Sequence, residues 1–85
     1  MYGYICVKNF SSYPAISVYI NDRLYFPDLL TESAYKQVSY GSAQVIVLNN
    51  RSKIIFDIYL PVHSKWRYVL EIYQNSYNFI PVGFS

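Results

Sequence analysis

The stretch Ala15-Ile-Ser-Val-Tyr-Ile-Asn-Asp22 decides the fold class of this 85-residue chain. Its isoleucine and valine residues alternate with serine and tyrosine. This period of two is typical of a strand that is buried on one face. Asn21-Asp22 readily adopts the left-handed conformations of a tight hairpin turn, so a second strand is expected over residues 23–26.

Similar runs of β-branched and aromatic residues recur along the chain, separated by turn residues. We expect further strands over residues 2–8, 43–48, 53–60, 66–73 and 79–84. The nearly continuous apolar run 43–48 predicts a strand covered on both faces. Two sets of alternating residues are each expected to share one face: Ile54, Phe56, Ile58 and Leu60 in one strand, and Trp66, Tyr68, Leu70 and Ile72 in another.

Residues 27–38 allow two interpretations. Pro27 followed by Asp28 and Glu32 could begin a short helix. The same segment could cross between two sheets and become a strand near residues 35–39, which is the interpretation we favour. Six to eight short strands without a long amphipathic segment predict a small antiparallel all-β sandwich or barrel, as one domain over residues 1–85.

The composition points to an interaction surface. Hydrophobic residues make up 53% of the chain, aromatic residues 20% and charged residues only 14%, whereas ordinary soluble domains are about 25% charged. A chain this short cannot bury so many apolar groups, and exposed apolar patches mark interaction surfaces. We predict an interaction surface from six of the eleven tyrosines: Tyr2, Tyr4, Tyr13, Tyr19, Tyr59 and Tyr73. The alternative is that tyrosine, a good strand former, simply covers sheet faces.

The charge pattern argues against two classes of partner. The net charge is +2, and the seven cationic residues are scattered along the sequence. Nucleic acid binding and polybasic membrane anchoring both need clustered cations. No apolar run approaches the length of a membrane-spanning helix, so no transmembrane segment is expected. The N-terminus has no signal-peptide pattern.

No catalytic or metal-binding motif is present in the sequence. One cysteine and one histidine are too few for a zinc site, and we expect neither a metal nor a cofactor. Cys6 and His63 would form a nucleophile and base only if the fold brought them together. Asp57 and Glu71 could face each other on neighbouring strands, where ion pairs with Lys53 and Arg67 are the better explanation.

The run from Tyr4 to Asp22 resembles the opening of the bacterial domain of unknown function 4397. Pro14-Ala15 followed by Val18-Tyr19-Ile20-Asn21 carries most of the resemblance, and Tyr40-Gly41 and the strand at 66–70 extend it. Asp22 departs from the glycine that is usual in that family. The resemblance implies an immunoglobulin-like or transthyretin-like β-sandwich of the cell envelope or surface, with no assigned activity.

Three functional hypotheses follow. The first is a non-catalytic structural or interaction module that self-associates, or binds another surface protein, through tyrosine-rich faces or open strand edges. Strand 2–8 lacks a proline that would block strand addition. The second is a carbohydrate-binding module that uses surface tyrosines and Trp66. The third is a Cys6–His63 enzyme. The sequence favours a protein that is not an enzyme.

Overall fold

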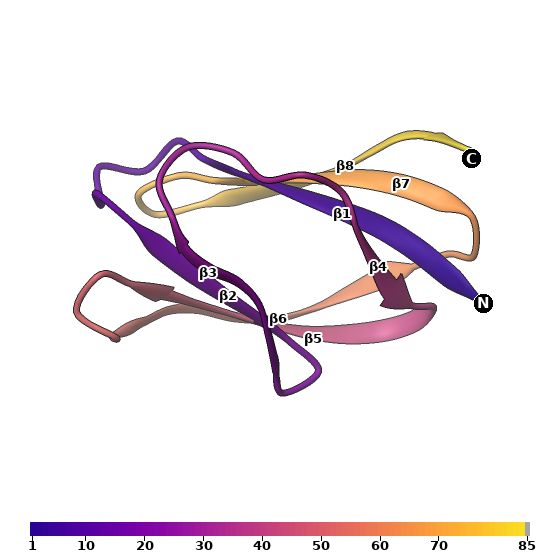
Figure 1. Ribbon diagram of the computed structural model, residues 1–85, viewed down its shortest axis with the longest axis horizontal. Coiled ribbons are helices and arrows are strands. Elements are labelled where there is room, and N and C mark those ends of the chain that lie inside the picture. The colour runs from indigo at the N-terminus through magenta and orange to yellow at the C-terminus, as the bar shows by residue number, and fades with distance from the viewer. Residues whose placement is uncertain (85) are drawn as a thin grey trace.

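The computed structural model describes residues 1–84 and contains eight strands, with no helix in that range. The strands are β1 (Tyr2–Asn9), β2 (Ile16–Ile20), β3 (Arg23–Leu29), β4 (Lys36–Ser39), β5 (Gly41–Asn49), β6 (Ile54–Val62), β7 (Trp66–Ile72) and β8 (Tyr77–Phe84). Figure 1 shows them arranged in two layers. In β2, Ile16, Val18 and Ile20 are buried, and the residues between them are half-buried, so the predicted alternation is confirmed.

Each layer is a four-stranded sheet. Sheet A has the strand order β4-β1-β7-β8, and sheet B has the order β3-β2-β5-β6. The hydrophobic core lies between the sheets and consists of aliphatic side chains together with Ala43, Phe26 and Tyr68. The predicted all-β, sandwich-like architecture is confirmed.

One strand pairing differs from the antiparallel sheet that we predicted. β1 runs parallel to β7, with Tyr4 opposite Arg67 and Asn9 opposite Ile72. The other five pairings are antiparallel. A parallel pair needs a long connection, which here passes through all of sheet B. β1 therefore lies inside sheet A, between β4 and β7, and the expectation that it offers an open edge is wrong.

The two hairpins of sheet B have the turns expected from their asparagines. Asn21 and Asp22 have φ values of 50° and 65°, so both adopt the left-handed conformation that a tight hairpin needs. In the β5–β6 hairpin, the side-chain Oδ1 of Asn49 accepts hydrogen bonds from the backbone N–H groups of Arg51 (2.9 Å) and Lys53 (3.0 Å). Asn49 is buried, and these bonds satisfy its carbonyl oxygen.

Residues 27–38 contain no helix, and the crossing interpretation is confirmed. β3 continues through Pro27 to Leu29, with Asp28 at a φ of 46° where the pairing with β2 is irregular. The crossing then runs along β1. The Asn9 N–H donates to the Thr31 carbonyl (2.6 Å), and the Ser33 N–H donates to the Val7 carbonyl (2.9 Å). The chain enters β4 at Lys36, within the expected range.

Two expectations about β5 and β6 are wrong. The register shifts between Val47 and Leu48, so that Leu48 pairs with Ile54. This shift leaves Ile54 55% exposed and places Ile55 against the core, so Ile54 does not share a face with Phe56. β5 is buried on one face only, because alternate residues from Gln44 to Leu48 are half-buried on the other.

Candidate interaction surfaces

The structure divides the six predicted tyrosines among four places. Tyr2 and Tyr4 lie on the outward side of β1 in sheet A, and Tyr19 and Tyr59 lie on the outward side of sheet B. Tyr13, in the link between β1 and β2, packs against the core, so its expected outward position is wrong. Tyr73 follows β7 and stacks on Phe10, with ring centroids 5.5 Å apart. These tyrosines do not form one continuous stripe.

A contiguous apolar surface does form on the outward side of sheet B. One cross-strand row reads Leu24, Tyr19, Ile46 and Asp57 across the four strands, and the next row places Leu48 beside Ile54. We call this surface the sheet B face and define it by six residues: Tyr19, Leu24, Ile46, Leu48, Ile54 and Tyr59. The most exposed members are Tyr59 (66%), Ile54 (55%) and Leu24 (46%).

Sequence reasoning found Tyr19 and Tyr59 but missed the aliphatic members of this face. A shallow depression near its centre is lined by Tyr19, Ile46, Leu48 and Ile54, with Asp22 at one side. Asp57, at the end of the central row, accepts a hydrogen bond from the Gln44 side-chain amide (3.2 Å). The sequence carried one signal for these aliphatic residues. The uninterrupted apolar run from Val45 to Leu48 places apolar side chains on both faces of β5, and those on the outward face are half-buried.

The outward side of sheet A, the sheet A face, is more fully covered. Its central row consists of Cys6, Val69 and Ile80, of which Cys6 is 4% and Val69 8% exposed. The row above it contains Tyr4 beside Arg67, and the row below contains Lys8 beside Glu71. The Arg67 guanidinium carbon lies 5.9 Å from the centre of the Tyr4 ring and 5.5 Å from that of Tyr35, a cation–π arrangement.

The exposed strand edges carry features that oppose strand addition. The four edge strands are β3, β4, β6 and β8. Pro27, Pro61 and Pro81 lie on three of them, and each lacks the N–H that an added strand would need. The fourth, β4, has only four residues. The sheet B face is consequently better suited to association than the edges.

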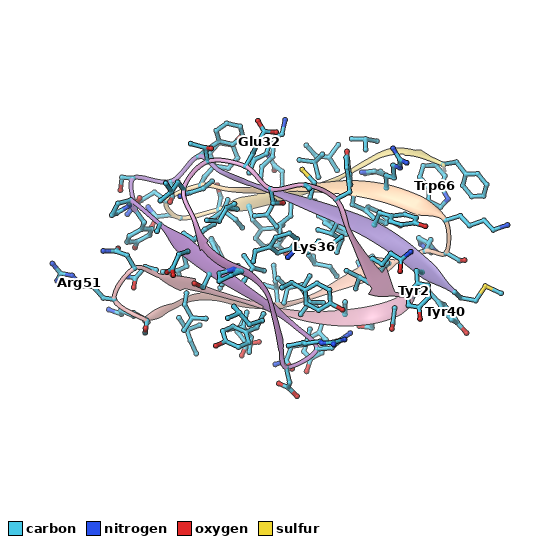
Figure 2. The ribbon with its side chains drawn as sticks, in the orientation of Figure 1. Tyr2, Glu32, Lys36, Tyr40, Arg51 and Trp66 are labelled. Atoms are coloured by element: carbon cyan, nitrogen blue, oxygen red, sulfur yellow. The ribbon has the colours of Figure 1, made fainter. Side chains whose placement is uncertain are left out.

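The two sides of the sandwich where the sheets are not joined by strand pairing are covered by different contacts. On the β3–β4 side, the Lys36 ammonium donates to the Tyr25 carbonyl and lies 5.1 Å from the centre of the Phe26 ring; Figure 2 shows Lys36 between the layers. On the β6–β8 side, Phe56 packs edge-to-face on Tyr77, with ring centroids 5.5 Å apart.

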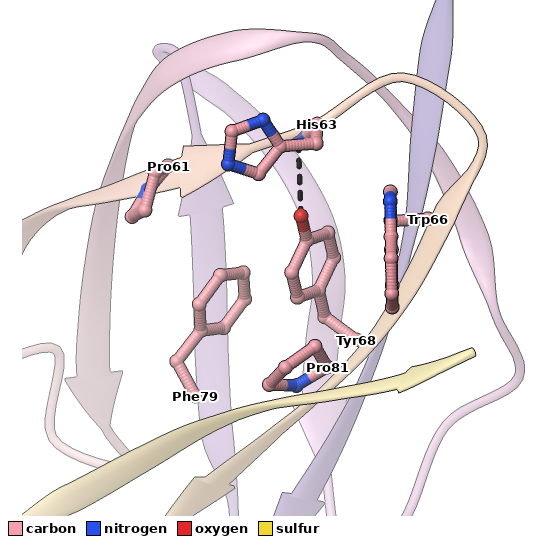
Figure 3. Close-up of a pocket in the computed structure, with 6 residues that line it drawn as sticks. All are labelled: Pro61, His63, Trp66, Tyr68, Phe79 and Pro81. Carbon is pink, nitrogen blue, oxygen red and sulfur yellow. Dashed lines mark hydrogen bonds between the residues drawn. The ribbon is translucent and has the colours of Figure 1, made fainter. Parts of the chain in front are cut away.

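Further along this second side lies a pocket of about 510 Å³, which we call the aromatic pocket (Figure 3). Its lining residues are Pro61, His63, Trp66, Tyr68, Phe79 and Pro81. The Tyr68 and Phe79 rings stack with centroids 4.4 Å apart, and the Tyr68 hydroxyl accepts a hydrogen bond from the His63 backbone N–H (2.9 Å). Sequence reasoning singled out His63 and Trp66 but did not connect them.

Cys6 and His63 belong to different parts of the molecule. Cys6 points outward from the middle of sheet A, whereas His63 lines the aromatic pocket. Burial raises the pKa of the Cys6 thiol, although Lys8 opposes the shift. A buried thiol of raised pKa is a poor nucleophile. Within residues 1–84, no hydrogen bond joins Cys6 to His63.

Asp57 and Glu71 do not face each other. Asp57 lies in sheet B and Glu71 in sheet A, both facing outward, so the expectation that they could face each other is wrong. Glu71 accepts hydrogen bonds from the Tyr73 hydroxyl (3.0 Å) and the Asn78 amide (3.3 Å). The hydrogen bond to Glu71 raises the pKa of the Tyr73 hydroxyl. The carboxylates of Asp57 and Glu71 therefore accept hydrogen bonds from neutral groups, in place of the ion pairs with Lys53 and Arg67 that we predicted from the sequence.

Two further observations concern metal binding and membrane crossing. Residues 1–84 contain no group of three or more histidine, cysteine, aspartate or glutamate side chains placed to hold a metal ion. In the same range, no helix has the length and apolar character needed to cross a membrane. No protein-family model matches the chain, and no curated protein matches it either.

Proposed function

We propose that this protein is a non-catalytic interaction module that pairs with a second copy of itself through the sheet B face. The observation that carries the proposal is the apolar central row, Leu24, Tyr19 and Ile46, which crosses three strands without an intervening polar residue. Apolar surface removed from water contributes about 25 cal/mol per Å². A flat sheet face of this kind packs well against another sheet face.

The strand order of sheet B allows a two-fold arrangement of two such faces. Leu24 on edge strand β3 forms one end of the central row, and Asp57 on edge strand β6 forms the other. A copy related by a two-fold axis that lies in the interface, parallel to the strands, would bring the two sheet B faces together and place the β3 edge of one copy over the β6 edge of the other. Isologous pairing of this type is the commonest way in which soluble proteins associate.

The test is the mass of the protein in solution over about a hundredfold dilution, since dimers dissociate by mass action. We expect a dimer that dissociates on dilution. Ile54→Lys should raise the dissociation constant by at least about tenfold, because it places a charge in the apolar face. Val82→Lys is the matched control: Val82 is 51% exposed, similar to Ile54, but lies on β8 in sheet A.

Three outcomes decide the proposal. Dissociation by Ile54→Lys alone supports it. A monomer at every concentration overturns it, and so does a dimer that Val82→Lys weakens as much as Ile54→Lys.

Carbohydrate binding is the second candidate, and a different pocket favours it. A pocket of about 560 Å³ lies between the link before β2 and the β5–β6 hairpin. Its lining includes the Tyr13 ring, Asn50, Arg51 and Lys53. Sugars need an apolar ring face together with hydrogen-bonding groups, and this pocket offers both. Loss of glycan-array binding on Tyr13→Ala, with Tyr59→Ala as control, would support this candidate; a wild-type protein that binds no glycan would exclude it.

For the fold type, we propose the transthyretin-like alternative over the immunoglobulin-like one. In the constant-type immunoglobulin sandwich the first two strands share a sheet, whereas here β1 and β2 lie in different sheets. Membership of the domain family 4397 and a place in the cell envelope stay predictions, on which the proposed self-association does not depend.

A further inference from the structure

The aromatic pocket is built from side chains that other contacts already hold in place. Tyr68 is 4% exposed and stacks on Phe79 at an interplanar angle of 9°. Trp66 packs edge-to-face on Phe84, with ring centroids 5.6 Å apart. Walls that are fixed before binding reduce the conformational entropy that a ligand must overcome. The pocket therefore offers preformed flat surfaces.

The lining defines the polarity of what can enter. It contains no lysine, arginine, aspartate or glutamate, and the Tyr68 hydroxyl is already bonded to the His63 backbone. A charged ligand would lose hydration without meeting an opposite charge, and a sugar would leave several hydroxyl groups unpaired. Only three lining groups could meet a polar atom of a ligand: the His63 imidazole, the Trp66 indole N–H, and the Tyr68 hydroxyl proton, which is not used when the oxygen accepts from His63.

We propose that the aromatic pocket binds a small, neutral, planar aromatic molecule that carries at most two polar groups. The volume of about 510 Å³ falls within the range of about 300–1,000 Å³ that is usual for small-molecule sites. Ring faces of Trp66 and Phe79 would contact the ligand, and aromatic pairs of this type contribute about 0.5–1.5 kcal/mol beyond area burial. The proposal does not rest on self-association, because no lining residue belongs to the sheet B face.

Trp66 is the only tryptophan in the chain, so its fluorescence reports on this pocket directly. The probe is 4-nitrobenzyl alcohol, a neutral planar ring with one hydroxyl group, whose nitro group quenches indole emission on contact. We expect saturable quenching of the intact protein, in contrast to the linear collisional quenching of free N-acetyltryptophanamide. Two comparison probes, 4-nitrobenzoate and methyl glucoside, test the exclusion of charge and of sugars.

Two adjacent residues of β8 provide matched variants. Pro81 lines the pocket, whereas Val82 is 51% exposed and does not line it. Pro81→Asp should weaken binding by at least about tenfold, because it places a charge against the ring faces, and Val82→Asp should leave binding unchanged. His63→Glu tests the opposite rim in case Pro81→Asp unfolds, and circular dichroism checks each fold.

The outcomes separate cleanly. Saturable binding that Pro81→Asp or His63→Glu weakens and Val82→Asp does not supports the proposal. Its failure would appear as quenching no different from that of free N-acetyltryptophanamide, as equal weakening by Val82→Asp, or as tighter binding of 4-nitrobenzoate or methyl glucoside. None of these results bears on the dimer, which the dilution experiment tests separately.

Discussion

The outward faces of the two sheets have similar backbones but different surfaces. Each has an apolar central row: Cys6, Val69 and Ile80 in sheet A, and Leu24, Tyr19 and Ile46 in sheet B. In sheet A two of the three residues are nearly inaccessible to water, whereas in sheet B all three are half-buried or exposed.

The neighbouring rows explain the difference. The central row of sheet A lies between long side chains, with Tyr4 and Arg67 on one side and Lys8 and Glu71 on the other. Long charged side chains cover apolar surface with their aliphatic stems. In sheet B, the flanking rows contain Ser17, Leu48 and Ile54 on one side and Gln44 and Tyr59 on the other, and none of these side chains is charged. Long charged side chains beside the row thus distinguish the covered face of sheet A from the more exposed face of sheet B.

The largest expected effect comes from placing a charge in each face. Val69→Asp should reduce the free energy of unfolding by at least about 3 kcal/mol, because it leaves an uncompensated charge at a buried position. Leu48→Asp, on the half-buried sheet B face, should cost about 1 kcal/mol in the monomer. Urea denaturation, at protein concentrations too low for the dimer to form, measures both changes in the free energy of unfolding. Equal losses would show that the two faces do not differ in coverage.

A smaller effect is expected from changing Arg67, one of the long side chains that cover the central row of sheet A. Arg67→Met keeps the length of the side chain but removes the guanidinium group that lies over Tyr4 and Tyr35. The loss should be about 1 kcal/mol, the sum of two partly exposed cation–π contacts. Arg51→Met, at the exposed β5–β6 turn, is the matched control and should change stability by less than about 0.5 kcal/mol. Indistinguishable unfolding of the two variants would contradict the role given to Arg67.

The smallest effect concerns the pH dependence that Cys6 adds. Burial raises the pKa of its thiol above the ordinary value of 9.0, so the folded state holds this proton more tightly than the unfolded state. The stability contributed by the protonated thiol is complete below that value and declines as the pH rises above it. The difference in unfolding free energy between wild type and Cys6→Ala should therefore be constant near neutral pH and fall above pH 9. A difference in unfolding free energy that grows as the pH rises would contradict a raised pKa for the Cys6 thiol.

Local features of the fold were predictable from the sequence, and pairing was not. The period of two placed Ile16, Val18 and Ile20 in the core, and Asn21-Asp22 predicted its turn, because both depend on neighbouring residues only. The error at Ile54 has a different origin. The β5–β6 register shift reverses the side of one residue, and a sequence pattern does not carry that information.

The same limit applies to the candidate surfaces. Tyr19 and Tyr59 were found because they are unusual in composition, yet their neighbours Leu24 and Ile46 become part of one surface only through strand order. The aromatic pocket joins residues from β6, β7 and β8 and the turn at His63. Its closing contact, Tyr68 on Phe79, depends on the β7–β8 register.

The position of β1 also sets the order of events during folding. β1 is made first, but its parallel partner β7 comes more than 50 residues later, after the whole of sheet B. Until then, the backbone of β1 on that side has no partner, and the apolar residues Ile5 and Val7 have no completed sheet around them. Loops of this length make folding slow, and an unpaired strand is the part of a folding chain most prone to aggregate. On the ribosome, sheet A can be completed only after β7 and β8 have been made.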